Sequence, residues 1–110
     1  MVTLGLQARL EAKPGKEMEL EEFLHAQLSY AIGEPATVAW FAVKLAPGVF
    51  GIFDAFADES GRKAHLEGEI AKALQGDVGK NLLAKPPTIE SFQVLAAKLP
   101  GNGEIPDSLG

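Results

Sequence analysis

The stretch TVAWFAVKLAPGVFGIFDAFA, residues 37–57, decides the fold. It holds two runs rich in β-branched and aromatic residues, 37–45 and 49–57, which are joined by Ala46-Pro47-Gly48. Two such runs around a short Pro-Gly loop are typical of a β-hairpin. Successive side chains of a strand point to opposite faces, and in both runs apolar side chains occur on each face. We therefore expect both faces of this hairpin to be buried.

The segments on either side of the hairpin supply the other elements. Residues 2–10 alternate apolar and polar side chains, which predicts a half-buried strand. Apolar residues then recur at helical spacing behind a glutamate-rich first turn, and Gly33 and Pro35 end that helix. We expect, in order, a strand over 2–10, a helix over 17–32, the hairpin, a helix from Asp58 to about Leu66 that resumes over 69–75, a short helix over 77–83 and a strand over 88–98.

This β-α-β-β-α-β order is that of the ferredoxin-like split unit, an α+β fold with an antiparallel sheet. Helices can cover one face of such a sheet, and the apolar residues on the other face need a partner. The simplest partner is the same sheet of a second copy, so we predict a homodimer that forms a dimeric α+β barrel. The domain is expected over residues 1–99, and the Gly/Pro-rich residues 100–110 are expected to form a flexible tail.

Composition excludes several function classes. The 110 residues suffice for one domain, and the net charge of −5 disfavours binding to nucleic acid or to an anionic membrane. The absence of cysteine excludes disulfides, thiolate metal sites and thiol nucleophiles. The first residues lack the continuous apolar segment of a signal peptide, and no stretch approaches the roughly 20 apolar residues that span a bilayer. We therefore expect a cytoplasmic protein.

Two residues have the chemistry for proton transfer. His65 shares a helix face with Arg62 and Leu66, and a histidine that faces inward can exchange a proton near neutral pH. Asp54 shares a strand face with Ile52 and Phe56, an apolar setting that raises the pKa of a carboxylate unless a cation pairs with it. The alternatives are a packed histidine and a structural salt bridge of Asp54 with Arg62 or with a cation of the partner chain.

Other residues could shape a binding pocket. Trp40, on the neighbouring strand, could stack on a flat ligand, although aromatic residues on a two-sided sheet commonly belong to the core. Tyr30 lies at the edge of the apolar stripe of its helix and could donate a hydrogen bond into a pocket, whereas His25 lies off that stripe and is expected in solvent. No metal-ligand spacing and no phosphate-binding loop occurs, so we expect neither a metal site nor a cofactor.

Three segments together resemble one known family. ARLEAKPGKEMELEEFL, the hairpin end GIFDAFADE, and GRKAHL resemble the antibiotic biosynthesis monooxygenase family, including its quinol monooxygenase-like members. The likeness extends over about residues 3–97 in the expected order. It implies a dimeric barrel with a pocket between each sheet and its own helices. Some members of this family oxidise quinols or polycyclic aromatics without metal or flavin, and related members degrade haem.

The positions that carry these activities in the family differ here. An asparagine of the haem-degrading members falls at Ala8, and their tryptophan and haem-ligating histidine fall near His65 and Gln75. The asparagine and the tryptophan of the polyketide-oxidising members fall at Ile52 and Phe56. The resemblance therefore implies an aromatic pocket in which the polar group of those members is missing.

The main functional hypothesis is a cofactor-independent monooxygenase that oxidises a small aromatic or quinol-like substrate with dioxygen. Its catalytic residues would be His65 and Asp54. Its pocket would be built from Trp40, Phe56, Ile52, Tyr30 and Arg62. The alternatives are a non-catalytic dimer that binds a small apolar molecule and a domain that serves assembly alone, so the sequence leaves open whether the chain is an enzyme.

Overall fold

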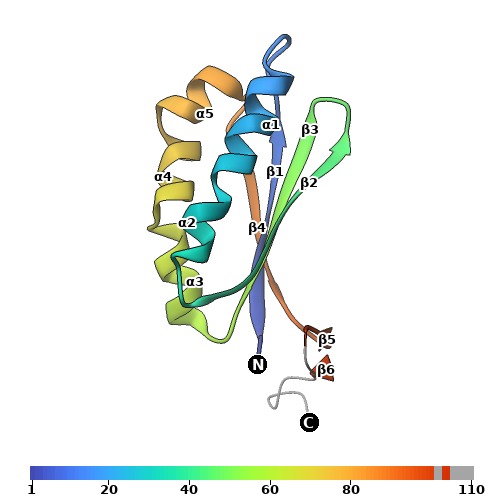
Figure 1. Cartoon of the computed structure of the whole chain (residues 1–110), viewed down its shortest axis with the longest axis vertical. Helices are drawn as coiled ribbons and strands as arrows, with labels where there is room; N and C mark the ends of the chain where they lie inside the picture. Colours follow the sequence, from blue (N-terminus) through green and yellow to red (C-terminus); the bar gives the residue numbers. More distant parts are fainter. Residues whose placement is uncertain (101–102, 105–110) are drawn as a thin grey trace.

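The computed structural model describes residues 1–100 and the backbone of Gly103–Glu104. Helices lie on one side of a twisted sheet, with the β2–β3 turn and the N-terminus at opposite ends (Figure 1). The elements are β1 (Leu4–Glu11), α1 (Glu17–Ala26), α2 (Leu28–Ile32), β2 (Thr37–Ala46), β3 (Val49–Phe56), α3 (Glu59–Leu66), α4 (Glu69–Gln75), α5 (Asp77–Leu82), β4 (Thr88–Gln93), β5 (Ala97–Lys98) and β6 (Gly103–Glu104).

The main sheet has the strand order β2-β3-β1-β4 with every neighbouring pair antiparallel. This is the predicted α+β, ferredoxin-like arrangement, with α5 as the expected short helix before the last strand of the sheet. Strand β1 lies in the centre, where it pairs with β3 on one side and β4 on the other. The two hydrogen-bonding edges of β1 are therefore both occupied, and β2 and β4 form the edges of the sheet.

Two element boundaries differ from the prediction. The helix expected over 17–32 is divided at Gln27, a buried residue whose side-chain Nε2 donates to the Phe23 carbonyl (3.0 Å). The strand expected to reach Lys98 ends at Gln93, which pairs with Leu4, the first residue of β1. One further hydrogen bond follows, from the Val94 N–H to the Thr3 carbonyl (2.9 Å), and the chain then leaves the sheet because β1 offers no further residues to pair with.

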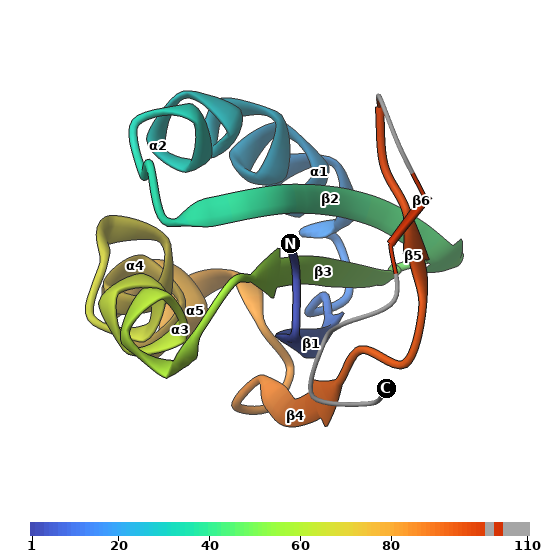
Figure 2. The same cartoon turned by 90° about the horizontal axis from the view of Figure 1, so that it is seen from below.

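The hydrophobic core lies between the helices and one face of the sheet. Seen from below, α3, α4 and α5 lie along this face and α1 and α2 cover its β2 side (Figure 2). Fully or nearly fully buried side chains come from both layers. They include Leu10, Phe50 and Ile52 of the sheet, Leu20 and Leu24 of α1, and Ile70 and Leu74 of α4.

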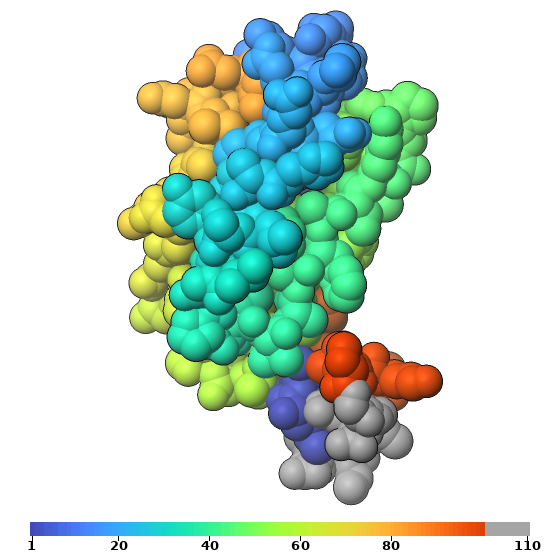
Figure 3. Space-filling view, viewed as in Figure 1, coloured from blue at the N-terminus to red at the C-terminus, as the bar shows by residue number. Residues whose placement is uncertain are grey.

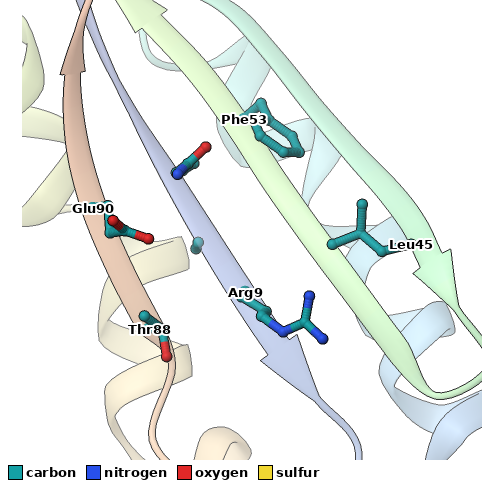
Figure 4. A pocket seen from close by; sticks show the side chains of 7 residues that line it. Arg9, Leu45, Phe53, Thr88 and Glu90 are labelled. Carbon is teal, nitrogen blue, oxygen red and sulfur yellow. The ribbon is translucent and has the colours of Figure 1, made fainter.

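The opposite face, which we call the open face, carries no helix. Phe41 of β2 and Phe53 of β3 lie directly across from each other on it, and the neighbouring Leu45 shares this side. Phe41 is 58% exposed and Leu45 48% exposed in the single chain. Figure 4 shows Leu45 and Phe53 beside Arg9, Thr88 and Glu90, which together line a shallow hollow of about 250 Å³. The open face is thus apolar along β2 and β3 and mixed toward β4, where Phe92 covers Gly5 near the polar Thr88 and Glu90.

The chain leaves the sheet after β4. This segment extends beyond the body of the molecule (Figure 3), and β5 within it pairs with β6 on the side of the sheet away from the helices (Figure 2). Most of the predicted tail over 100–110 lies outside the described residues. Among the described residues, no helix has the length and apolar character needed to cross a membrane.

A close backbone approach at Gly79 determines the corner between α4 and α5. A Cβ atom at this position would lie 1.8 Å from the Leu74 carbonyl oxygen. We expect Gly79→Ala to lower the free energy of unfolding by about 1–3 kcal/mol, because the backbone must shift to remove the overlap. Urea denaturation followed by circular dichroism measures this change.

Gly33→Ala is the matched control. Gly33 has φ −75° and the nearest atoms to a new Cβ would lie 3.5 Å away. It should leave stability unchanged or raise it by about 0.4–1 kcal/mol through the unfolded state. Equal destabilisation by both substitutions would contradict the close-packed corner.

Candidate functional site

Helix α3 brings a histidine onto the helix-covered face of the sheet. Asp58 caps the helix, because its Oδ1 accepts hydrogen bonds from the Ser60 hydroxyl (2.7 Å) and the Gly61 backbone N–H (3.0 Å). These two hydrogen bonds lower the pKa of Asp58, so the cap is an anion at the positive end of the helix. The helix then places His65 in its last turn, 6% exposed, with its ring centroid 5.4 Å from that of Phe56.

His65 lies between two carboxylates. Its Nε2 is 2.9 Å from Oδ2 of Asp54, which is buried on β3, and its Nδ1 is 2.6 Å from Oε1 of Glu34. Glu34 belongs to the turn between α2 and β2, where its Oε1 also accepts a hydrogen bond from the Thr37 hydroxyl (2.8 Å). We call these three side chains, Glu34, His65 and Asp54, the carboxylate–histidine cluster. It joins α3, β3 and the turn before β2.

The surroundings of His65 favour its protonated form. Burial lowers the pKa of the imidazole, but hydrogen bonds to Asp54 and Glu34 and the charges of both carboxylates raise it by more. The net effect raises the pKa of His65 above its usual value near 6.5. With both ring nitrogens donating, the imidazolium has no free nitrogen with which to accept a proton.

A small cavity adjoins the cluster. It has a volume of about 30 Å³, and Asp54, His65, Ile52, Leu66 and Ile89 are among the residues that line it. The second oxygen of Asp54, Oδ1, is buried and has no hydrogen-bond partner among the described residues. A cavity of this size holds roughly one or two water molecules. The site therefore presents one free carboxylate oxygen in a small, mostly apolar space.

Trp40 provides a second unsatisfied group. It is the register partner of Asp54 on the neighbouring strand β2 and faces the same side of the sheet. Its indole Nε1 is buried without a hydrogen-bond partner in the described part of the chain. Cross-strand neighbours have Cβ atoms about 4.5–5.5 Å apart. An unpaired donor and an unpaired acceptor thus belong to adjacent residues on one face.

The structure separates the residues that were expected to form a pocket. It brings His65, Asp54 and Ile52 around the cavity, with Phe56 fully buried against the histidine ring. Tyr30 is 49% exposed, and Arg62 turns to Glu59, with Nε 3.2 Å from Oε1. Trp40, Tyr30 and Arg62 do not line the cavity. Asp54 therefore has His65 as its partner, and the alternative salt bridge with Arg62 is not formed.

Sequence reasoning missed Glu34. It lies in the non-periodic turn Gly33-Glu34-Pro35, where no spacing relates it to residue 65. A carboxylate next to two helix-ending residues gave no sign that it would meet a histidine from a later helix.

Among the described residues, no cluster of three or more histidine or acidic side chains has an arrangement that could hold a metal ion.

Comparison with known proteins identifies a related structure. The crystal structure of a protein of unknown function from Nitrosomonas europaea is 54% identical, with a TM-score of 0.87 over 93% of this chain and 98% of that one. A "putative antibiotic biosynthesis monooxygenase" from Caulobacter crescentus is 24% identical, with a TM-score of 0.69 over 84% and 90% of the two chains. Another from Nitrosomonas europaea is 18% identical, with a TM-score of 0.73 over the same shares.

These likenesses have different weight. The first relative is similar in sequence along nearly its whole length, whereas the two monooxygenase-like structures share the fold alone. No family model matches the chain, and neither does any curated protein.

The raised pKa of His65 predicts a pH-dependent stability. The folded protein binds the imidazole proton more tightly than the unfolded chain, so the stabilisation is fully present below about pH 6.5 and is lost as the pH rises through the folded-state pKa. We expect the free energy of unfolding to fall between neutral and alkaline pH. Urea denaturation at a series of pH values from 6 to about 9 measures this slope.

Two variants separate the histidines. His25 is exposed on α1, so His25→Gln should keep the wild-type slope above neutral pH, whereas His65→Gln should lose it. Stability that rises with pH in this range, or an unchanged slope in His65→Gln, would contradict a protonated His65 in the folded state.

Proposed function

Because this chain belongs to the same family as the 54% identical Nitrosomonas europaea protein of unknown function, and shares the fold of the antibiotic biosynthesis monooxygenase-like structures, we propose that it is a cofactor-independent monooxygenase. Its substrate would be a small aromatic, quinol-like molecule. The observation that carries the proposal is the buried Asp54 carboxylate, held through Oδ2 by His65 and unpartnered at Oδ1 beside a cavity.

In this proposal Asp54 accepts the substrate proton. Asp54 lines the cavity, and its buried Oδ1 has no hydrogen-bond partner among the described residues, whereas both nitrogens of His65 are engaged. His65 is then a positioning residue, which orients Asp54 and offsets its charge. These roles are the reverse of those that the sequence pattern favoured, in which His65 accepted the proton and Asp54 oriented His65.

Trp40 would stabilise the anion that results. Trp40 does not line the cavity as it stands, so this contact requires the cavity to widen toward β2. A phenolic hydroxyl that donates to Asp54 Oδ1 would then accept a hydrogen bond from the Trp40 indole N–H, whose residue is the register partner of Asp54. As the proton moves to Asp54, that hydrogen bond becomes stronger because the oxygen becomes negative. The apolar walls of the cavity exclude water and strengthen both interactions.

The oxidation balances without an external reductant. The quinol anion is electron-rich and reacts with dioxygen at a ring carbon, where a C–O bond forms. Cleavage of the O–O bond then leaves one oxygen atom on the ring, while the other leaves as water with two protons. The substrate supplies all four electrons, two in hydroxylation of the ring carbon and two in oxidation of the quinol to the quinone. The chain itself contributes orientation, exclusion of water and proton transfer.

Entry of an aromatic ring requires the cavity to open. At about 30 Å³ the cavity has room for water alone, and Leu66 and Ile89, which line it, are 38% and 39% exposed. These side chains lie where α3 and α4 approach β4, and their outward rotation would admit a ring next to Asp54. Ile52 and Phe56 stand where the polyketide-oxidising members of the family carry their polar groups, so the proton acceptor here is two residues away from either position.

The open face supports a second copy as the partner. Phe41 and Leu45 are about half exposed in the single chain and adjoin Phe53 on a surface without helices. Contiguous exposed apolar side chains mark interaction surfaces. We propose a homodimer in which two open faces pack together, as the dimeric barrel requires. The helix-covered face of each sheet then keeps its own cavity.

A non-catalytic, ligand-binding dimer is the second candidate. It is favoured by one observation, a groove of about 600 Å³ that shares Leu74 and Ile89 with the small cavity. In that case the carboxylate–histidine cluster would be structural and the wild type would not turn over any quinol.

The proposed chemistry predicts oxygen consumption without an added reductant, with a hydroxylated quinone and water as the products from a quinol, and an anthraquinone and water as the products from an anthrone. Asp54→Asn keeps an oxygen that His65 can bind but removes the base, so it should lower kcat by at least about a hundredfold. Trp40→Phe removes a hydrogen-bond donor to the anion and should lower kcat by about a hundredfold. Because the indole N–H has no protein partner, this second variant should retain its fold.

Glu67→Gln is the control, since Glu67 is an exposed acid at the end of α3, the helix that carries His65. It should keep wild-type turnover. An oxygen electrode measures the rates and circular dichroism checks each fold. A wild type inert toward the whole panel, or an Asp54→Asn variant with unchanged kcat, would overturn the proposal.

The proposed dimer predicts a mass of about twice 11.6 kDa by light scattering at micromolar concentration. Phe41→Glu places a charge on the open face at a side chain that is already 58% exposed in one chain, so it should yield a folded monomer. Met18→Glu, at a 77% exposed position on α1, should remain dimeric. A monomeric wild type, or a dimeric Phe41→Glu protein, would exclude assembly through this face.

A further inference from the structure

A groove of about 600 Å³ lies between the α4–α5 corner and the chain that leads into β4. Its apolar lining includes Leu74 of α4, Leu83, Pro87 and Ile89. Leu74 and Ile89 also line the small cavity at Asp54, so the groove adjoins that cavity on the helix-covered side of the sheet. Its volume lies in the range of about 300–1,000 Å³ that is typical of sites for small molecules.

The charge of the groove is opposite to that of the protein. Lys13, Lys80 and Lys85 line it, and none of its described lining residues is acidic. These are three of the ten basic residues of a chain whose net charge is −5. A local excess of positive charge beside an apolar surface attracts anions despite the overall negative charge.

Two of these lysines have no carboxylate partner among the described residues. Lys85 Nζ is 2.9 Å from Glu11 Oε2, and this pairing lowers the pKa of Glu11. The Lys13 ammonium donates to the backbone carbonyl of Lys80, which fixes its position, and neither Lys13 nor Lys80 forms an ion pair in the described part of the chain. Their charges are therefore available to a ligand.

We propose that this groove is a binding site for a small amphipathic anion, an apolar carboxylate. The apolar body would lie along Leu74, Pro87 and Ile89, and the carboxylate would lie at Lys13 and Lys80. Charge complementarity and the apolar lining together specify this class, since a neutral apolar molecule would leave the lysines unused and a polar anion would leave the apolar wall unused. The site does not depend on proton transfer by Asp54, and it lies on the side of the sheet away from the open face.

Calorimetric titration of the full chain with 1-naphthylacetate and with its neutral analogue 2-(1-naphthyl)ethanol tests this site. At low salt the carboxylate should bind on the order of tenfold more tightly than the alcohol. The difference should shrink at high salt, because the lysine charges are exposed to solvent and are screened. Equal affinities for the two molecules, or no binding of either, would overturn the proposal.

Three variants locate the site. Lys13→Gln combined with Lys80→Gln should remove the preference for the carboxylate and leave binding of the alcohol unchanged. Lys63→Gln, which removes one lysine charge at an exposed position on α3, should have no effect. Ala84→Trp fills the groove from an exposed lining position and should weaken both molecules. Unchanged binding in Ala84→Trp, or an equal loss in Lys63→Gln, would place the binding elsewhere.

Asp54→Asn distinguishes this inference from the proposed chemistry. It should bind 1-naphthylacetate as the wild type does, because Asp54 lines the small cavity and not the groove. In this variant, turnover tests the monooxygenase proposal and binding of 1-naphthylacetate tests the groove. Loss of binding would contradict the groove alone, and unchanged turnover would contradict the monooxygenase proposal alone.

Discussion

The ion-paired histidine beneath the sheet is the interaction on which the rest of this side of the molecule depends. A buried charge without a partner costs several kcal/mol, so the buried His65 and Asp54 require each other in place, and the partly exposed Glu34 adds a second carboxylate to the imidazolium. Their contacts join three segments that are distant in sequence: the turn before β2, the end of β3 and the last turn of α3. The distance of α3 from the sheet, and with it the cavity between them, follows from this cluster.

The polar atoms of this region differ in whether they have hydrogen-bond partners, and this difference is what suggests a chemical role. Both nitrogens of His65 and one oxygen of Asp54 are engaged, whereas Asp54 Oδ1 and Trp40 Nε1 are buried without a partner in the part of the chain that the structure describes. Each unsatisfied buried group costs about 1–3 kcal/mol. A purely structural pair would gain by burying neither group, and this cost is the physical reason for assigning a ligand-binding role to this part of the sheet.

Much of the fold follows from periodicity, but contacts between segments do not. Alternation in 2–10 and in the hairpin, and helical spacing around Leu20 and Leu24, predicted the element order and placed His65 and Asp54 on inward faces. Glu34 escaped prediction because a turn has no period, and the end of β4 depends on where β1 begins. The size of the cavity depends on how Leu66 and Ile70 pack, and the protonation of His65 depends on Glu34. Residue spacing in the sequence predicts neither the size of the cavity nor the protonation of His65.

The register of the β2–β3 hairpin assigns different tasks to the two faces of the sheet. Inward positions of β3 carry Ile52, Asp54 and Phe56, while Phe53 points outward beside Phe41 of β2. Successive side chains alternate between faces, so a slip of one residue would expose Asp54 to solvent and bury Phe53 under the helices. Irregularities in pairing occur only near the two ends of β2, at Thr37/Ala39 and Lys44/Ala46, and the pairs between them are regular. The same regular segment therefore determines both the proton-accepting site and the surface that we assign to the second copy, and a change that shifts one must also alter the other.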